Sequence, residues 1–217
     1  MQLILLSGPS GGGKTTFLHL LQSGALQEPV RRAFPGDAGT WPIIDITNRL
    51  RSEIEKSGPA AVWQSLQAGQ KAILHYDIVS VHRAGLSGYA ADPAFRLLEG
   101  KGDVRVAFLK PEPGRLLSQF ASRNEARLEE KIRDAGVIER RTQLLFDSLG
   151  QRLGLAKGST ELALYADAVE LDRLYASWIA FASELARRHG GHPLVTLTPS
   201  TGPDGRPDFD IVPAGGV

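Results

Sequence analysis

A chain of 217 residues, of which 42% are hydrophobic, is long enough to bury the core of one sizeable α/β domain. Its 25 Lys and Arg nearly balance its 24 Asp and Glu, and a net charge of +1 gives no global field that would favour nucleic acid or an anionic membrane. Because cysteine is absent, the sequence excludes a disulfide framework, a thiolate metal site and a cysteine nucleophile, which fits a reducing compartment.

The first residues run directly into an apolar strand pattern, which leaves no room for the basic, apolar and cleavage regions of a secretory signal. No apolar run approaches the roughly 20 residues that span a bilayer. We therefore expect a cytoplasmic protein with no membrane segment and no nucleic-acid partner. The sequence gives no indication of its oligomeric state.

The stretch LILLSGPSGGGKTTFLHLL, residues 3–21, has the most specific chemistry. An apolar run at 3–6 predicts a buried strand, glycines follow at once, and an apolar helical pattern begins after Lys14. From Gly8 to Thr15 the spacing matches G-x-x-x-x-G-K-[ST], the Walker A motif or P-loop. The alternative interpretation is a glycine-rich turn that only happens to precede a helix.

Each residue type in this loop has a physical reason. Glycines let the main chain approach a phosphate, and the free amides at a helix amino terminus attract an anion. Lys14 would add a positive charge for the β and γ phosphates, while the Thr15 hydroxyl would bind Mg²⁺ and Thr16 would reach the α phosphate. With ATP and Mg²⁺ as the expected cofactors, the predicted nucleotide-binding residues are Gly8, Ser10, Gly11, Gly12, Gly13, Lys14, Thr15 and Thr16.

Strand and helix patterns alternate along the rest of the chain. Strands are expected at 42–46, 71–81, 104–109 and 192–197, with a hairpin edge at 209–212 and a further short strand considered near residue 29. Helices are expected at 48–57, 60–68, 138–153 and 168–188, with the first two separated by Ser57-Gly58-Pro59. This alternation predicts a parallel sheet covered by helices on both faces.

The string GPSGGGKTT resembles the loop of guanylate kinase and its relatives among the nucleoside-monophosphate-kinase-like P-loop enzymes, whose usual form is GPSGxGK[ST][ST]. The resemblance covers the first twenty or so residues. It implies an α/β, three-layer P-loop NTPase sandwich, which we expect as a single domain over residues 1–217. The residues after the loop do not contain the pattern with which guanylate kinases bind GMP, so the resemblance does not imply GMP as the substrate.

The segment from residue 104 onward is also similar to that kinase group, in which a buried strand runs into a proline-containing turn, a helix and an arginine-bearing lid. Residues 110–160 are therefore expected to form a helical lid-like region. Arg123 and Arg127 lie one turn apart and are the candidates to close over the γ phosphate. Ion pairing with the many neighbouring acids on a helix face is the alternative for these arginines.

Two acids follow apolar strand patterns, where ligands of parallel sheets bind. Asp77 is the Walker B candidate, which would share Mg²⁺ with Thr15 or act as a general base, and pairing with Arg83 is its alternative. Asp45 would hold or deprotonate the acceptor hydroxyl, as an acid after the second strand often does in kinases of this build. His75 is interpreted as a packed strand residue, with a role as acid or base as the alternative.

These patterns predict a phosphotransferase that uses ATP and Mg²⁺ on a small nucleotide-like or sugar-like acceptor. Lys14, Asp77, Asp45, Arg123 and Arg127 are its predicted catalytic residues. The alternative is a nucleotide-hydrolysing switch that acts on a protein partner. No N-K-x-D guanine motif and no LSGGQ segment is present, which disfavours a Ras-like GTPase and a transporter ATPase.

Overall fold

The computed structural model describes residues 1–66, 69–120, 122 and 164–212, without the side chains of residues 82 and 83. The chain divides into two compact units, Met1–Pro111 with Tyr175–Val217, and Glu112–Leu174. The single domain expected over residues 1–217 stays a prediction. Most of the expected lid, 110–160, lies outside the described residues.

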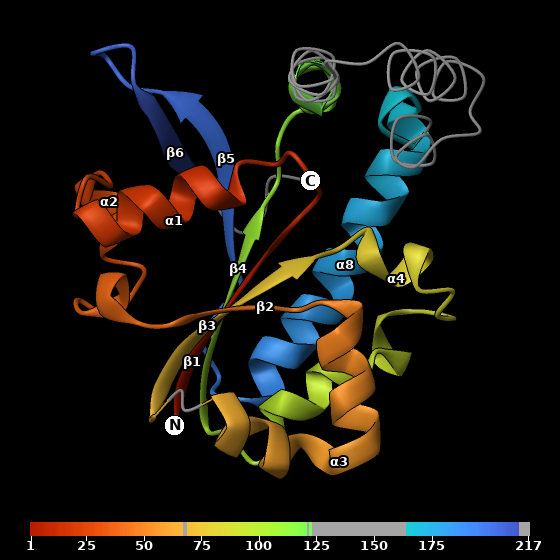
Figure 1. The fold of residues 1–217 in the computed structure, drawn as a ribbon. Helices are drawn as coiled ribbons and strands as arrows, with labels where there is room; N and C mark the ends of the chain where they lie inside the picture. Colours follow the sequence, from red (N-terminus) through yellow and green to blue (C-terminus); the bar gives the residue numbers. More distant parts are fainter. Residues whose placement is uncertain (67–68, 121, 123–163, 213–217) are drawn as a thin grey trace, which may run out of the picture. The chain divides into compact units, whose positions relative to one another are not determined.

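The first unit contains a six-stranded sheet in the order β2-β3-β1-β4-β5-β6 (Figure 1). Its strands are β1 Gln2–Gly8, β2 Ile43–Asp45, β3 Lys71–Asp77, β4 Asp103–Leu109, β5 Val195–Thr201 and β6 Pro207–Val212. The first five are parallel, and β6 returns antiparallel to β5. The α/β prediction with a largely parallel sheet is therefore confirmed.

Helices cover both faces of this sheet. On one face, β1 side chains pack with α1, which runs over Lys14–Ser23, in a core that includes Ile4, Leu6 and Phe17. On the other face, the Trp178 indole donates to the Ser7 hydroxyl at 3.0 Å, which fixes the later part of α8 there. Figure 1 shows α3 on the same side as this part of α8. Apolar residues of β1 are buried from both sides, which explains their unbroken run.

The helical elements whose bounds are described are α1, α2 Glu28–Arg31, η1 Ala38–Thr40, α3 Asn48–Leu66, α4 Ser80–Arg83, η2 Tyr89–Ala91, η3 Pro93–Leu98 and α8 Ala168–Arg188. Among these, α1, α3 and α8 are the long helices. A break inside α3 at Gly58, with φ 79° and Pro59 next to it, agrees with the two helices expected on either side. None of the described helices is both long and apolar enough to cross a membrane.

Three predicted elements need correction. β3 ends at Asp77 and not at residue 81, because the Asp77 Oδ1 accepts from the Val79 amide and turns the chain toward α4. Residues 28–31 form a helix and not a strand, since Pro29 suits a first helical turn. β5 covers 195–201 instead of 192–197 because its pairing with β6 extends to Thr201.

The second unit is described only in part. Residues 113–120 are helical, and Leu116 and Phe120 are buried. The rings of Phe120 and Tyr165 meet edge to face, with centroids 5.2 Å apart. This unit therefore has apolar packing of its own, and Leu171 and Leu174 in the first turns of α8 are also buried.

Candidate functional site

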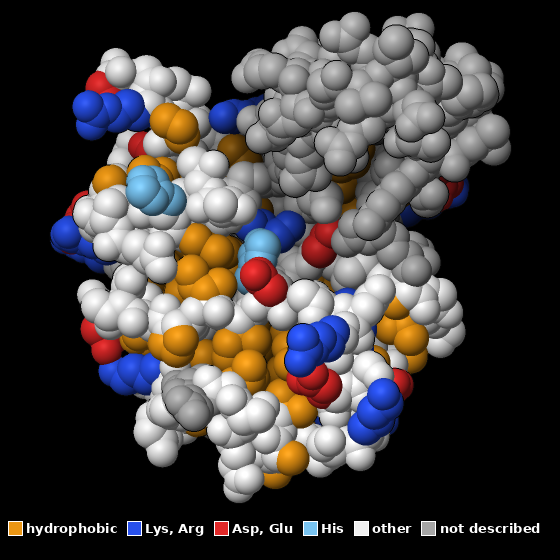
Figure 2. Space-filling model, viewed as in Figure 1, with side chains coloured by type: hydrophobic (Ala, Val, Ile, Leu, Met, Phe, Trp, Pro, Cys, Tyr) orange, Lys and Arg blue, Asp and Glu red, His pale blue; other side chains and the backbone are white. Residues whose placement is uncertain are grey.

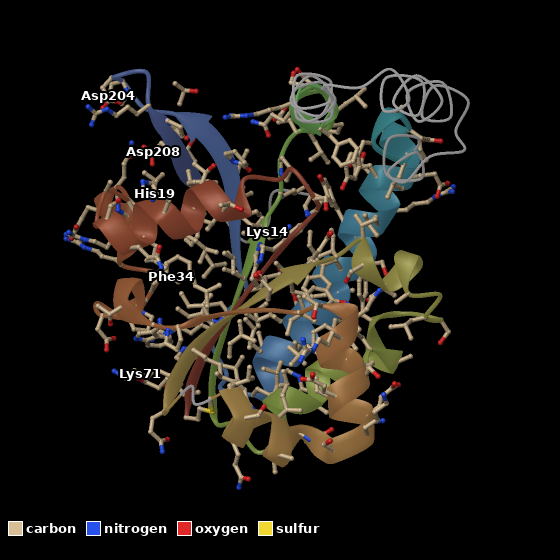
Figure 3. The ribbon with its side chains drawn as sticks, viewed as in Figure 1. Lys14, His19, Phe34, Lys71, Asp204 and Asp208 are labelled. Carbon is tan, nitrogen blue, oxygen red and sulfur yellow. The ribbon has the colours of Figure 1, made fainter. Side chains whose placement is uncertain are left out.

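The glycine loop lies between β1 and α1, at the carboxyl edge of the sheet. Gly8 ends β1 and Lys14 begins α1, so residues 9–13 form the connection. Figure 3 labels Lys14 at this edge and Lys71, the first residue of β3, at the opposite edge. Parallel α/β sheets bind their ligands beyond the carboxyl ends of the strands, and β1 lies between β3 and β4 at the centre of this sheet.

The loop backbone needs its glycines. Gly11 and Gly13 have φ of 79° and 90°, in the left-handed region that side chains disfavour. A Cβ on Gly12 would lie 3.0 Å from the Pro9 carbonyl oxygen, which the Gly12 amide already contacts at 3.0 Å. Gly13 caps α1 without a side-chain hydrogen bond, so no cap side chain satisfies the first amides of this helix. Such amides are suited to bind an anion.

Lys14 is held against its own loop. Its side chain is buried, and its Nζ donates to the carbonyl oxygens of Gly8 and Pro9, each at 2.7 Å. In Figure 2, basic, acidic and histidine side chains meet near the middle of the visible face, where Figure 3 labels Lys14. The positive charge therefore lies beside the loop that would receive the phosphates.

Asp77 lies next to the same loop. It pairs with Gly8 at the last register position of β1 and β3. Its Oδ2 accepts from the Ser10 hydroxyl at 2.7 Å, and its Oδ1 accepts from the Val79 amide at 3.1 Å. The structure therefore brings the predicted acid together with the loop, through a contact with Ser10 that the sequence did not indicate.

The oxygen donors of the site suit magnesium. Thr15 and Thr16 lie exposed in the first turn of α1, and Asp77 is half-buried at the end of β3. Mg²⁺ prefers oxygen ligands and is commonly bound by one or two carboxylates together with substrate phosphates. The Thr15 hydroxyl and the Asp77 carboxylate fit this ion as a partial set of ligands.

Asp45 in β2 and His75 in β3 contact each other near the same carboxyl edge of the sheet. They are register partners in β2 and β3, and the Asp45 Oδ1 lies 2.5 Å from the His75 Nδ1. Burial lowers the pKa of His75, and the positive charge of Lys14 lowers it further, against the opposing effect of Asp45. The His75 Nε2 is buried and has no partner among the described residues. The sequence carries no direct signal for this pair, because the contact depends on the register of β2 against β3.

A buried ion pair that the sequence did not indicate lies beyond the end of β3. The Arg51 guanidinium binds both carboxylate oxygens of Asp92 and also donates to the Ser80 hydroxyl at 2.6 Å. The Tyr76 hydroxyl donates to the same carboxylate at 2.9 Å. Burial opposes the charge of Arg51, but Asp92 outweighs it and raises the Arg51 pKa. This network connects α3 with the segment that follows Asp77.

Three residues of the sequence-based hypotheses lie outside what the structure describes. Arg123 and Arg127, the predicted lid arginines, fall within the undescribed residues 123–163. The side chain of Arg83, considered as a partner for Asp77, is also not described. The roles proposed for these arginines stay predictions.

Comparisons with known proteins add little to this geometry. No protein-family model and no curated protein matches the chain. Among solved structures, the chain is similar to a shikimate kinase from Acinetobacter baumannii in complex with shikimate, at 16% sequence identity. The match covers 80% of this chain and 93% of that one with a TM-score of 0.32, a value at which the likeness supports no conclusion.

Proposed function

We propose that the protein is a phosphotransferase that uses ATP and Mg²⁺ to phosphorylate a small-molecule acceptor with nucleotide-like or sugar-like chemistry. One observation carries the proposal: the glycine loop contacts Lys14 through the Gly8 and Pro9 carbonyls and Asp77 through the Ser10 hydroxyl. A cation for phosphate and a carboxylate for a metal thus meet at one loop. Such a pair is what phosphoryl transfer on a P-loop requires.

In this proposal, Gly8 to Thr16 hold the triphosphate, and Lys14 interacts with the β and γ phosphates. Thr15 and Asp77 would hold Mg²⁺, which neutralises phosphate charge when bound. The rest of the catalytic effect would come from positioning the acceptor and the phosphates, because phosphoryl transfer requires little covalent chemistry from the protein.

The acceptor would lie on the side of the loop where Asp45 and Asp77 end their strands. Its hydroxyl oxygen forms the new bond to the γ phosphorus, and the bond to the β–γ bridging oxygen breaks. The hydroxyl proton passes to a carboxylate, for which Asp45 or Asp77 is proposed. Arg123 and Arg127 are proposed to close over the transferring phosphoryl group.

The proposed location of the protein is the cytoplasm.

The direct test is a coupled assay of ADP formation over nucleotide, sugar and cofactor acceptors, with Mg²⁺ and ATP. We expect one class of acceptor to stimulate turnover and to carry the transferred phosphate, and Lys14→Ala to abolish the stimulation. ATP turnover that no acceptor stimulates, but that a partner protein accelerates, would contradict the kinase proposal. That result would favour a nucleotide-hydrolysing switch.

A further inference from the structure

Ser10 makes a contact that its position in the motif does not require. The general motif G-x-x-x-x-G-K-[ST] specifies no side chain at this position, although the loop form GPSGxGK[ST][ST] has serine there. Its hydroxyl nevertheless donates to the Asp77 Oδ2 at 2.7 Å, a length typical of a hydrogen bond to a charged carboxylate. Ser10 therefore connects the phosphate loop to the acid at the end of the neighbouring strand.

The Asp77 carboxylate is held at both of its oxygens. The Val79 amide, in the turn after β3, donates to Oδ1, while the Ser10 hydroxyl donates to Oδ2. The Ser10 donor lies 67 positions from Asp77 in the sequence, whereas the Val79 donor lies two positions from it. Two donors on opposite oxygens fix the rotation of a carboxylate more firmly than either does alone.

The backbone that carries Ser10 is itself fixed. The Gly12 amide and the Lys14 ammonium both donate to the Pro9 carbonyl oxygen, and the Ile78 amide donates to the Gly8 carbonyl at 3.2 Å. The residue just before Ser10 is therefore tied to α1, and the loop entrance is tied to the end of β3. The Ser10 hydroxyl therefore donates to Asp77 from a backbone that several hydrogen bonds restrain.

We propose that Ser10 is a positioning residue that holds the Asp77 carboxylate in the orientation in which it supports Mg²⁺ beside a bound nucleotide. The inference rests on the proposed function in taking the glycine loop as a nucleotide site and Asp77 as a partner of the metal. Ser10 acts through Asp77 in this account and makes no contact with the ion itself. Residues that orient a metal ligand commonly change metal affinity by about 10- to 100-fold when they are replaced.

The test measures ADP binding by isothermal titration calorimetry, once with excess Mg²⁺ and once with EDTA. The quantity compared is the dissociation constant of ADP in EDTA divided by its dissociation constant in Mg²⁺. A larger ratio means that the metal strengthens ADP binding more. We expect Ser10→Ala to lower this ratio by about tenfold. Ser10→Thr, which retains the hydroxyl, should keep a ratio close to that of the wild type. Ser10→Gly provides the same comparison if the alanine variant does not fold.

A double-mutant cycle with Asp77→Asn separates positioning from a general effect on loop shape. If Ser10 acts through Asp77, Ser10→Ala should change the ratio by less than about twofold when Asp77 is already replaced. An unchanged ratio in Ser10→Ala, or an equal fall in both backgrounds, would overturn the inference. A higher ratio would also overturn it, because the hydrogen bond would then compete with the metal.

These outcomes are distinct from failure of the proposed function. A wild-type protein that binds ADP with Mg²⁺ but phosphorylates no acceptor contradicts the kinase proposal and leaves the ratio measurable. A wild-type protein that binds no ADP overturns both.

Discussion

Two tyrosines near the end of β3 are buried in different surroundings. The ring of Tyr76 stacks on Trp178, and its hydroxyl donates to Asp92. Tyr89 meets the edge of the same indole, and its hydroxyl has no partner within the described part of the chain. Burial raises the pKa of both phenols, and the negative charges of Asp92 on Tyr76 and of Asp77 on Tyr89 raise it further.

These shifts predict loss of stability at alkaline pH. In the folded protein both phenols keep their protons as pH rises through the ordinary value of 10.0, while the unfolded chain releases them there. Their contribution is therefore fully present below pH 10 and is lost progressively above it. Tyrosinate absorbance should show that Tyr89→Phe leaves the folded-state titration near pH 10 unchanged. If that variant loses one tyrosinate from the folded-state titration, Tyr89 is not shielded as described.

The part of the site that could be predicted is the part that is local in sequence. Gly8 to Thr15 follow a fixed spacing, and Asp77 lies in a recognisable apolar strand pattern, although the strand was expected to continue to residue 81. The contact of Asp45 with His75 spans 30 positions and depends on the register of β2 against β3, which composition does not determine. The same limit applies to Ser10, whose partner lies 67 positions away.

At the scale of elements, one buried ion pair joins α3 to η3. Arg51 and Asp92 are 5% and 3% exposed, so removing one partner would leave an uncompensated charge in the interior. We expect Arg51→Met to lower the free energy of unfolding by about 3–5 kcal/mol, measured by chemical denaturation.

Arg49→Met is the matched control for that measurement, because Arg49 lies on the same helix with its side chain 90% exposed and pairs with Glu53 one turn away. Its loss should cost less than about 0.5 kcal/mol. Equal effects of the two substitutions would show that the Arg51 pair is not the buried link between α3 and η3.

Element boundaries were predictable where side-chain periodicity alone determines them. The amphipathic pattern of residues 168–188 matches α8 at both ends, and Gly58 with Pro59 marks the break within α3. The end of β3 depends instead on a side chain of the strand, since Asp77 binds the Val79 amide and stops the ladder. The extent of β5 depends on its partner β6, which comes later in the chain.

For the whole molecule, the strand order concentrates the chemistry at one edge of the first unit. β1 lies between β3 and β4, so the loop after β1 meets the end of β3 on one side and the end of β4 on the other. A Cβ on Gly8 would lie 3.0 Å from the Leu109 carbonyl oxygen at the end of β4. This close approach fixes the start of the glycine loop against the centre of the sheet. If a nucleotide binds there and only to the folded protein, it should raise the free energy of unfolding.

The most direct measurement of the central claim compares the affinity for Mg²⁺-ATP of the wild type, Lys14→Ala and Lys71→Ala. Lys71 is the matched control, since it lies at the opposite end of β3 with its side chain 42% exposed and pairs with Asp37. If the loop holds the triphosphate through Lys14, calorimetry should show that Lys14→Ala weakens binding by at least about tenfold and that Lys71→Ala leaves it unchanged. Equal affinities for all three proteins would contradict the account.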